Sequence, residues 1–123
     1  MRTRAAAVLA ALTASVAVVG VAPIAQADGY CPTNRVCMWE DTNYQGDRWV
    51  DTTVGAPGWF YDIDWWDGDN EISSIDNSTG NYIQVWGNDN PTGSSYCVRP
   101  HSRHSSLGSF DNDAESFVVV TSC

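Results

Sequence analysis

Two short stretches of the sequence carry the oxygen-bearing side chains that hard cations bind. The first covers residues 69–74, with the sequence Asp-Asn-Glu-Ile-Ser-Ser. It offers a carboxylate, an amide oxygen, a backbone carbonyl and a hydroxyl, supplied in that order by Asp69, Asn70, Glu71 and Ser73. Ca²⁺ takes about six to eight oxygen ligands of these kinds. The stretch therefore predicts a calcium site, and the alternative is that its side chains only cap turns.

The second stretch covers residues 111–116 and reads Asp-Asn-Asp-Ala-Glu-Ser. Its candidate calcium ligands are Asp111, Asn112, Asp113 and Glu115. The fifth position, a serine in the first stretch, is Glu115 here. A carboxylate at this position would either strengthen cation binding through its charge or misplace the ligand, so both outcomes stay open for the second stretch.

Residues 101–106 contain two histidines and three serines, residue types that can act in catalysis. His101 and His104 lie three residues apart, but no third ligand of matching type is adjacent, so the metal signal is weak. Ser102, Ser105 and Ser106 lie in the same segment without a nucleophile elbow or a triad spacing. We therefore expect this protein not to be an enzyme.

Four cysteines, Cys31, Cys37, Cys97 and Cys123, predict two disulfides, because an even number in a small secreted chain is typical of a disulfide framework. Three pairings are possible. We favour Cys31–Cys37 with Cys97–Cys123, since each bridge then stays within one half of the chain. A zinc site is the alternative, but the spacing contains no CxxC pair.

Residues 1–27 have the features of a secretory signal peptide. Arg2 and Arg4 supply the positive region, a long apolar stretch follows, and Ala-Gln-Ala at 25–27 matches a cleavage site. A membrane span is the competing interpretation of this segment. Cleavage would leave residues 28–123 as one small extracellular domain, with no remaining membrane attachment.

The charge of the predicted mature chain narrows its partners. All 15 acidic residues but only four of the six basic residues lie beyond residue 27, which gives a net charge of −11, and lysine is absent. Such a surface repels phosphate backbones, so we expect no nucleic-acid binding. It suits divalent cations or a basic partner. The mature part also holds all 14 aromatic residues, which argues against disorder, and we expect a folded monomer.

Short strands separated by dense turns predict an all-β fold. The segments with strand character are 36–40, 47–53, 72–75, 82–86, 95–99 and 116–121. Turn-forming Gly, Asn, Asp and Pro residues fill the gaps between them. This pattern is typical of a β-sandwich or a β-barrel.

The chain also contains an internal repeat. Trp39, Tyr44 and Gly46 are matched 47 residues later by Trp86, Pro91 and Gly93, so one aromatic is replaced by proline. The two acidic stretches repeat at an offset of 42 residues. We therefore expect two similar halves, at about 36–78 and 79–123, which bury one shared core.

These motifs resemble the βγ-crystallin superfamily, whose Greek-key motif spaces an aromatic, a second aromatic and a glycine as Trp39, Tyr44 and Gly46 are spaced. Its calcium-binding members carry an N/D-N/D-x-x-S/T-S stretch. The resemblance implies a βγ-crystallin-like sandwich of two Greek-key motifs, stabilised here by the disulfides. It also implies that a backbone carbonyl from the other motif's hairpin completes the calcium shell, which makes Glu40 and Gly87 candidates.

A narrower resemblance concerns residues 31–37, which read Cys-Pro-Thr-Asn-Arg-Val-Cys. This opening is similar to that of the secreted bacterial Streptomyces metalloproteinase inhibitor family. Cys97, Val98 and Arg99 resemble the family's inhibitory loop. The resemblance implies a secreted peptidase inhibitor directed at metalloproteases, with Val98 entering an apolar pocket of an extracellular protease. The alternative is that Cys97 and Val98 continue a strand whose alternate residues face the core.

Two further functions remain open at this stage. One is a calcium-binding structural or stress module without a protease partner. The other is an antimicrobial or cell-wall-binding module, because five aromatics lie between residues 59 and 66. For that function, Trp59, Trp65 and Trp66 would have to form an exposed patch.

Overall fold

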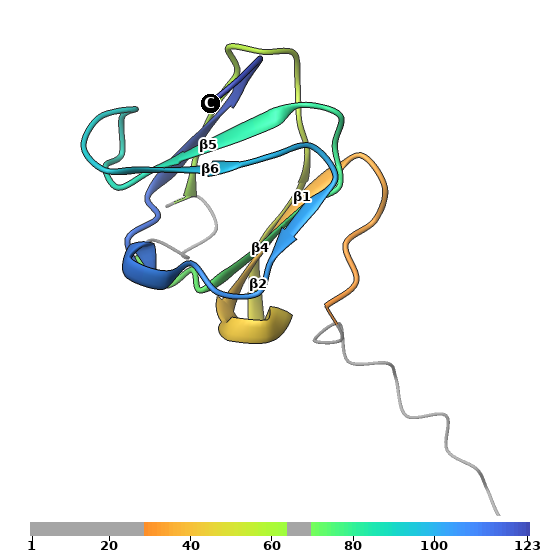
Figure 1. Cartoon of the computed structure of the whole chain (residues 1–123), viewed down its shortest axis with the longest axis vertical. Coiled ribbons are helices and arrows are strands. Elements are labelled where there is room, and N and C mark those ends of the chain that lie inside the picture. Colours follow the sequence, from red (N-terminus) through yellow and green to blue (C-terminus); the bar gives the residue numbers. More distant parts are fainter. Residues whose placement is uncertain (1–28, 64–69) are drawn as a thin grey trace, which may run out of the picture.

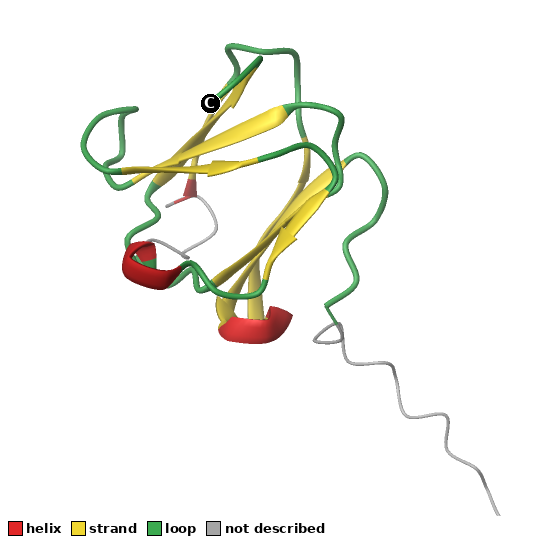
Figure 2. Ribbon diagram, viewed as in Figure 1, coloured by secondary structure: helices red, strands yellow, loops and turns green. Residues whose placement is uncertain are grey.

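The computed structural model describes residues 29–63 and 70–123. Within them, two four-stranded antiparallel sheets face each other (Figures 1 and 2). The first sheet contains, in spatial order, β2 (Gln45–Thr53), β1 (Arg35–Asp41), β4 (Ser74–Asn77) and β7 (Ser102–His104). The second contains β3 (Phe60–Asp62), β8 (Ser116–Val120), β5 (Tyr82–Trp86) and β6 (Ser95–Val98). The short 3₁₀ helices η2 (Thr42–Tyr44) and η4 (Gly108–Phe110) lie between strands.

Each half of the chain gives its third strand to the other half's sheet. β3 pairs with β8, and β7 pairs with β4. This exchange makes the all-β sandwich of two Greek keys that the sequence predicts, and it explains why neither half could bury its apolar face alone. The segments 60–62 and 102–104 were not among the predicted strands. Three residues are too few to show an alternating pattern, and the partners of both strands lie far away in the sequence.

The core fills the space between the sheets. Alternation along β1 and β5 turns Val36, Met38, Ile83 and Val85 inward, and all four are fully buried. Fourteen buried residues form this core among the described part of the chain: Val36, Met38, Val50, Ile63, Ile72, Ile75, Ile83, Val85, Val98, Leu107, Phe110, Ala114, Phe117 and Val119. Each fully buried aliphatic or aromatic side chain contributes about 1.5–3 kcal/mol.

Both predicted disulfides are present. Cys31–Cys37 joins the N-terminal segment to β1, and Cys97–Cys123 joins β6 to the C-terminus. In the chain-entropy model the shorter loop contributes about 2 kcal/mol and the longer one about 3.5 kcal/mol to stability.

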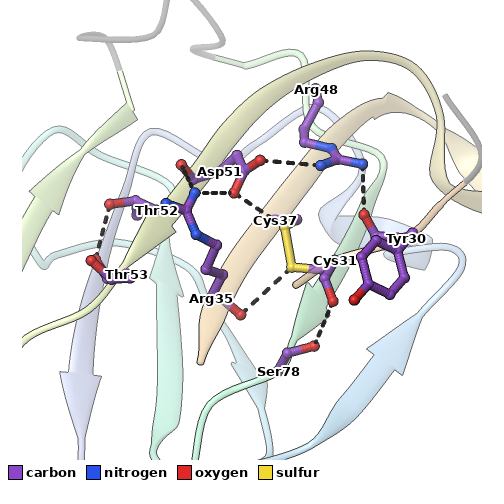
Figure 3. A network of polar contacts seen from close by, with 9 residues as sticks. All are labelled: Tyr30, Cys31, Arg35, Cys37, Arg48, Asp51, Thr52, Thr53 and Ser78. Atoms are coloured by element: carbon purple, nitrogen blue, oxygen red, sulfur yellow. Dashed lines mark hydrogen bonds and ion pairs between the residues drawn. A yellow bond between two sulfur atoms is a disulfide. The ribbon is translucent and has the colours of Figure 1, made fainter. Parts of the chain in front are cut away.

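The N-terminal segment covers the outer face of the first sheet (Figure 3). Arg48 donates to the Tyr30 carbonyl at 2.7 Å and pairs with Asp51, which also pairs with Arg35 at 2.6 Å. Burial would raise the pKa of Asp51, but the hydrogen bonds and charges of the two arginines outweigh it and hold this pKa below its usual value. The network fixes the segment on the sheet.

The expected signal peptide at 1–27 lies outside the described residues, as do Trp65, Trp66 and Asp69. Within residues 29–63 and 70–123, no helix has the length and apolar character needed to cross a membrane.

Candidate functional site

The last serine of each acidic stretch fixes a hairpin in its own half. Ser74 Oγ donates to the Asp41 carbonyl at 2.7 Å, and Ser116 Oγ donates to the Asn88 carbonyl at 2.7 Å. Asp41 and Asn88 are separated by the same 47 residues as the hairpin motifs. The sequence repeat therefore places an equivalent serine-to-carbonyl hydrogen bond in each half.

The two acidic stretches also cross one another. The Asn70 N–H donates to the Ala114 carbonyl and the Asn112 N–H donates to the Ile72 carbonyl, both at 3.0 Å. Asn70 and Asn112 adopt left-handed backbone conformations, with φ of 57° and 61°, which asparagine tolerates better than most residues. The crossing places the second residue of each stretch beside the fifth residue of the other.

Two oxygen clusters result from this crossing. In the first, Ser73 Oγ lies 3.4 Å from Asn112 Oδ1. In the second, Asn70 Nδ2 donates to Glu115 Oε1 at 3.0 Å. A depression opens at the first cluster, lined by Glu40, Asp41, Thr42, Asn43, Gln45, Asn70, Glu71, Ser73, Asp111 and Asn112.

Each cluster joins residues of both stretches, whereas the sequence prediction names the candidate ligands of each stretch separately. Glu40 lies in the depression of the first cluster. Gly87 is not among the residues that line this depression. It lies instead near Asp113, whose carbonyl oxygen is 3.5 Å from the position that a Cβ on Gly87 would take. The crossing depends on tertiary packing, which spacing within one stretch does not reveal.

The donors at the first cluster are amide, hydroxyl and carbonyl oxygens with scattered carboxylates. No group of three or more His, Cys, Asp or Glu residues within 29–63 and 70–123 is arranged to hold a metal. Such a donor set suits a hard cation that accepts neutral oxygens and water, and it does not suit zinc.

In the predicted inhibitory segment, Val98 is buried and Arg99 is exposed. Val98 ends β6, its relative exposure is 0%, and it belongs to the core. The expectation that Val98 enters a protease pocket is therefore wrong, because its side chain could reach a partner only if β6 left the sandwich. The alternative interpretation of Cys97 and Val98 as strand residues is the correct one. Arg99, the next residue, is exposed.

A tight turn, residues 99–101, follows β6 and leads into β7. We call it the β6–β7 turn. Pro100 fixes its own φ and restricts Arg99 to extended backbone. His101 turns the chain with φ of 51°. Arg99 and His101 are both exposed, so the turn presents two basic-type side chains outward.

The side chain of Asn77 anchors the backbone of this turn through hydrogen bonds. This side chain is fully buried, and its Nδ2 donates to the carbonyls of Arg99 at 3.0 Å and Val98 at 3.3 Å. Ser102 Oγ donates to the same Arg99 carbonyl at 2.7 Å, and the His101 N–H donates to the Thr79 carbonyl at 3.1 Å. The backbone of the turn is therefore fixed at both ends.

Tyr96 and His104 close the base of the turn, one from each sheet. Tyr96 Oη lies 2.6 Å from His104 Nδ1. Burial lowers the pKa of the His104 imidazole, and it raises the pKa of the Tyr96 hydroxyl. His104 thus forms a structural contact between strands β6 and β7.

Comparison with protein families shows the family of this chain. The family model for peptidase inhibitor family I36 matches residues 25–98, which is more than half of the chain. The chain belongs to peptidase inhibitor family I36. Its peptidase-inhibitor-like role follows from this membership, which also indicates an inhibitor and not an enzyme. No curated protein matches the chain. The match to this family ends at Val98, directly before the β6–β7 turn.

Solved structures similar to this I36 inhibitor are βγ-crystallin domains. A structure from work on the evolution of the eye-lens βγ-crystallin domain fold has a TM-score of 0.61 at 21% identity, over 75% of this chain and 91% of that one. The N-terminal domain of Protein S gives 0.55 at 21%, over 71% and 96%. A βγ-crystallin domain from Clostridium beijerinckii gives 0.54 at 20%, over 72% and 99%. These likenesses confirm the βγ-crystallin fold.

The I36 inhibitor also exposes aromatic side chains at the start of β3. Trp59 is 59% exposed and Phe60 is 44% exposed. The predicted patch of Trp59, Trp65 and Trp66 can be followed only at its first member, since the other two lie outside the described residues. Tyr61 faces inward and stacks on Phe117, with ring centroids 4.8 Å apart.

Sequence reasoning missed Asn77 in this I36 inhibitor. The signal was present in the repeat: Asn77 and Val119 are 42 residues apart, the offset of the two acidic stretches. A polar residue at a position where the other half places a core valine is costly to bury unless its hydrogen bonds are made. Such a residue points to a specific set of partners.

Proposed function

We propose that this I36 chain is a secreted inhibitor of extracellular metalloproteases that presents the β6–β7 turn to the target's cleft. One observation carries the proposal: the Arg99 carbonyl accepts hydrogen bonds from both Asn77 and Ser102. An exposed turn whose backbone is already fixed loses little conformational entropy on binding. Family membership supports the inhibitory role, and the resemblance of residues 31–37 to the metalloproteinase inhibitor opening supports the class of target.

The contact residues differ from those of the sequence prediction. Val98 serves the core, and Arg99 and His101 take its place as the exposed side chains of the turn. Cys97 contributes through its disulfide to Cys123, which anchors the end of β6 directly before the turn. Rigidity therefore comes from a covalent bridge on one side and a buried amide on the other.

Calcium binding is the second part of the proposal. The first oxygen cluster offers Ser73 and Asn112 side-chain oxygens and lies in a depression shared with Glu40, Glu71 and Asp111. Bound Ca²⁺ would stabilise the crossing of the two acidic stretches. A site filled at about 100 times Kd contributes about 2.7 kcal/mol to the free energy of unfolding. The second cluster is a poorer candidate, because the Asn70 amide N–H₂ already occupies Glu115.

The test is inhibition of a thermolysin-type zinc metallopeptidase by the purified protein. Assays in excess Ca²⁺ and after chelation and dialysis of the inhibitor separate the two parts of the proposal. We expect saturable inhibition in both conditions, and a thermal midpoint that falls without Ca²⁺. Absence of inhibition of secreted metallopeptidases would overturn the inhibitor proposal, whereas an unchanged thermal midpoint would overturn only the calcium site.

One observation favours a second candidate function. Trp59 and Phe60 are adjacent, large and exposed. Exposed aromatics of this kind are typical of surfaces that bind carbohydrate or protein partners. A cell-wall-binding module would use this surface and would not need the β6–β7 turn. Pull-down of the protein with insoluble peptidoglycan, and its loss in Trp59→Ala, would support this function.

A further inference from the structure

We infer that Arg99 is the specificity anchor of this inhibitor and that its target is a peptidase whose specificity pocket is acidic and accepts arginine. The inference rests on the proposed function, because it names the pocket chemistry of the target that the β6–β7 turn would enter. It depends on how the arginines are used, on how Arg99 is held, and on the charge around it.

Arginines are scarce and almost all serve the fold. The described residues contain four: Arg35, Arg48, Arg99 and Arg103. Arg35 and Arg48 share Asp51 under the N-terminal segment (Figure 3). Arg103 pairs with Asp76 at 2.9 Å, donates to the Gly29 carbonyl and lies 4.0 Å from the Tyr44 ring centroid.

Arg99 differs from these three. Within residues 29–63 and 70–123 it forms no ion pair, and its side chain is exposed. In the described part of the chain, the carbonyl of Arg99 accepts hydrogen bonds from the side chains of Asn77 and Ser102, whereas its guanidinium has no partner. The fold therefore uses the backbone of Arg99 and leaves its guanidinium available to a partner.

The backbone that carries the Arg99 side chain is restricted by its surroundings. The backbone before Pro100 is limited to extended conformations, and the next residue, His101, is tied through its N–H to the Thr79 carbonyl. Only the side-chain torsions of Arg99 need to be ordered when a partner binds. Arginine is a common hot spot in protein interfaces, since its planar fork pairs with a carboxylate through two hydrogen bonds.

The charge pattern identifies the partner's pocket. The predicted mature chain has a net charge of −11, so an exposed guanidinium without an ion-pair partner among the described residues differs from the acidic surface around it. A complementary target has a carboxylate at the bottom of the pocket that receives Arg99 and a neutral or basic rim around it. Peptidases that cleave beside arginine have a carboxylate in that pocket, as trypsin does. An apolar pocket would have to desolvate the guanidinium without a counter-charge.

The experiment measures inhibition constants against four secreted peptidases: a zinc metallopeptidase that accepts arginine, thermolysin, trypsin and chymotrypsin. The first and third have acidic pockets, and the other two have apolar pockets, so pocket chemistry is separated from catalytic class. The wild-type protein is compared with Arg99→Leu, Arg99→Lys and Arg99→Glu. Thermal unfolding of each variant controls for folding, and we expect the wild-type midpoint because the side chain has no partner within the described residues.

We expect the wild-type protein to inhibit arginine-accepting peptidases most strongly. Arg99→Leu should weaken that inhibition by about 30-fold, the effect of losing an interface hot spot. Arg99→Lys should retain part of it and Arg99→Glu none. Equal inhibition of apolar-pocket peptidases, with changes of no more than about threefold in every Arg99 variant, would overturn this inference and leave the inhibitor proposal standing. Inhibition of none of the four would overturn both.

Discussion

The two connections that carry the chain between the sheets are equivalent in the repeat, yet only the second is held by a buried side-chain amide. In the first half, residues 54–59 join β2 to β3 and are anchored by backbone bonds to β8: the Gly58 N–H donates to the Val119 carbonyl at 2.7 Å, and the Val119 N–H donates to the Trp59 carbonyl at 3.0 Å. In the second half, the β6–β7 turn is anchored by the buried side chain of Asn77.

The two anchors differ in what they require of the side chain at the equivalent position. A backbone anchor places no requirement on the side chain at position 119, which is free to be a core valine. A side-chain anchor removes one apolar residue from the core and requires every hydrogen bond of the buried amide to be made. Asn77 Oδ1 meets this requirement by accepting bonds from the N–H and hydroxyl of Thr79. The second connection has three residues against six in the first, and it exposes Arg99.

The largest effect is expected when Asn77 is replaced by valine, the residue at the equivalent position of the second half. Asn77→Val places the residue of position 119 at position 77 and leaves the Arg99 and Val98 carbonyls without their buried donor. We expect the free energy of unfolding to fall by about 3 kcal/mol, and inhibition to weaken by more than about tenfold where the protein remains folded. Urea unfolding and peptidase titration measure the two effects.

Val119→Ala is the matched control for Asn77→Val. It opens a cavity in the core but leaves the turn and its anchor intact, so it should lower stability without weakening inhibition at temperatures where the protein is folded. If both variants weaken inhibition equally, Asn77 acts only through global stability.

The two oxygen clusters allow a second comparison. Ser73→Ala removes a side-chain oxygen from the first cluster, and Glu115→Ala removes one from the second. We expect Ser73→Ala to abolish the stabilisation by Ca²⁺, which reaches about 2.7 kcal/mol at 100 times Kd, and Glu115→Ala to retain it. Thermal unfolding with and without Ca²⁺ measures the difference. Retention of the Ca²⁺ effect in Ser73→Ala and its loss in Glu115→Ala would reverse the assignment.

A smaller difference is expected between the hairpin serines. Replacing Ser74 or Ser116 by alanine removes one hydrogen bond to a hairpin carbonyl. Ser74 Oγ also accepts a hydrogen bond from the Tyr44 N–H at 3.0 Å. Ser74→Ala should therefore cost about 2 kcal/mol and Ser116→Ala about 1 kcal/mol. Chemical denaturation of the two variants under identical conditions gives these values, and equal losses would show that the Tyr44 bond adds nothing.

The smallest effect concerns the pH dependence of stability at the base of the turn. Because burial lowers the pKa of His104, the unfolded chain binds more protons at this site than the folded chain. The contribution of His104 is present above the unfolded pKa of about 6.5 and is lost as the pH falls towards the folded pKa. His104→Gln should flatten the stability profile between about pH 7 and 5. An equally steep profile in this variant would assign the dependence to other groups.

Much of the fold could be predicted from repeated residues. Trp39, Gly46 and their counterparts mark the hairpins, and both glycines have positive φ, 74° at Gly46 and 84° at Gly93. The disulfide pairing follows from keeping each bridge within one half. β3 and β7 could not be predicted, because each is defined by pairing with a strand of the opposite half.

The candidate site was predicted only in part. The motif points to Arg99 and leaves two positions open for Val98, and its alternation with Tyr96 along β6 favours the inward one. The sequence names the candidate calcium ligands one by one, but the contacts between the described members of the two stretches depend on the crossing of residues 70–74 with 111–116. Asn77 was missed because one buried amide leaves no pattern along the chain, and only its comparison with Val119 reveals it.

The most direct test of the account compares the two connections as inhibitory surfaces on one metallopeptidase. The double variant Arg99→Ala/His101→Ala changes the β6–β7 turn, and Trp59→Ala changes the connection in the first half. We predict that the double variant loses at least about 30-fold in inhibition while Trp59→Ala retains the wild-type inhibition constant. Loss of inhibition in Trp59→Ala, with the double variant unchanged, would contradict the account and move the inhibitory surface to the start of β3.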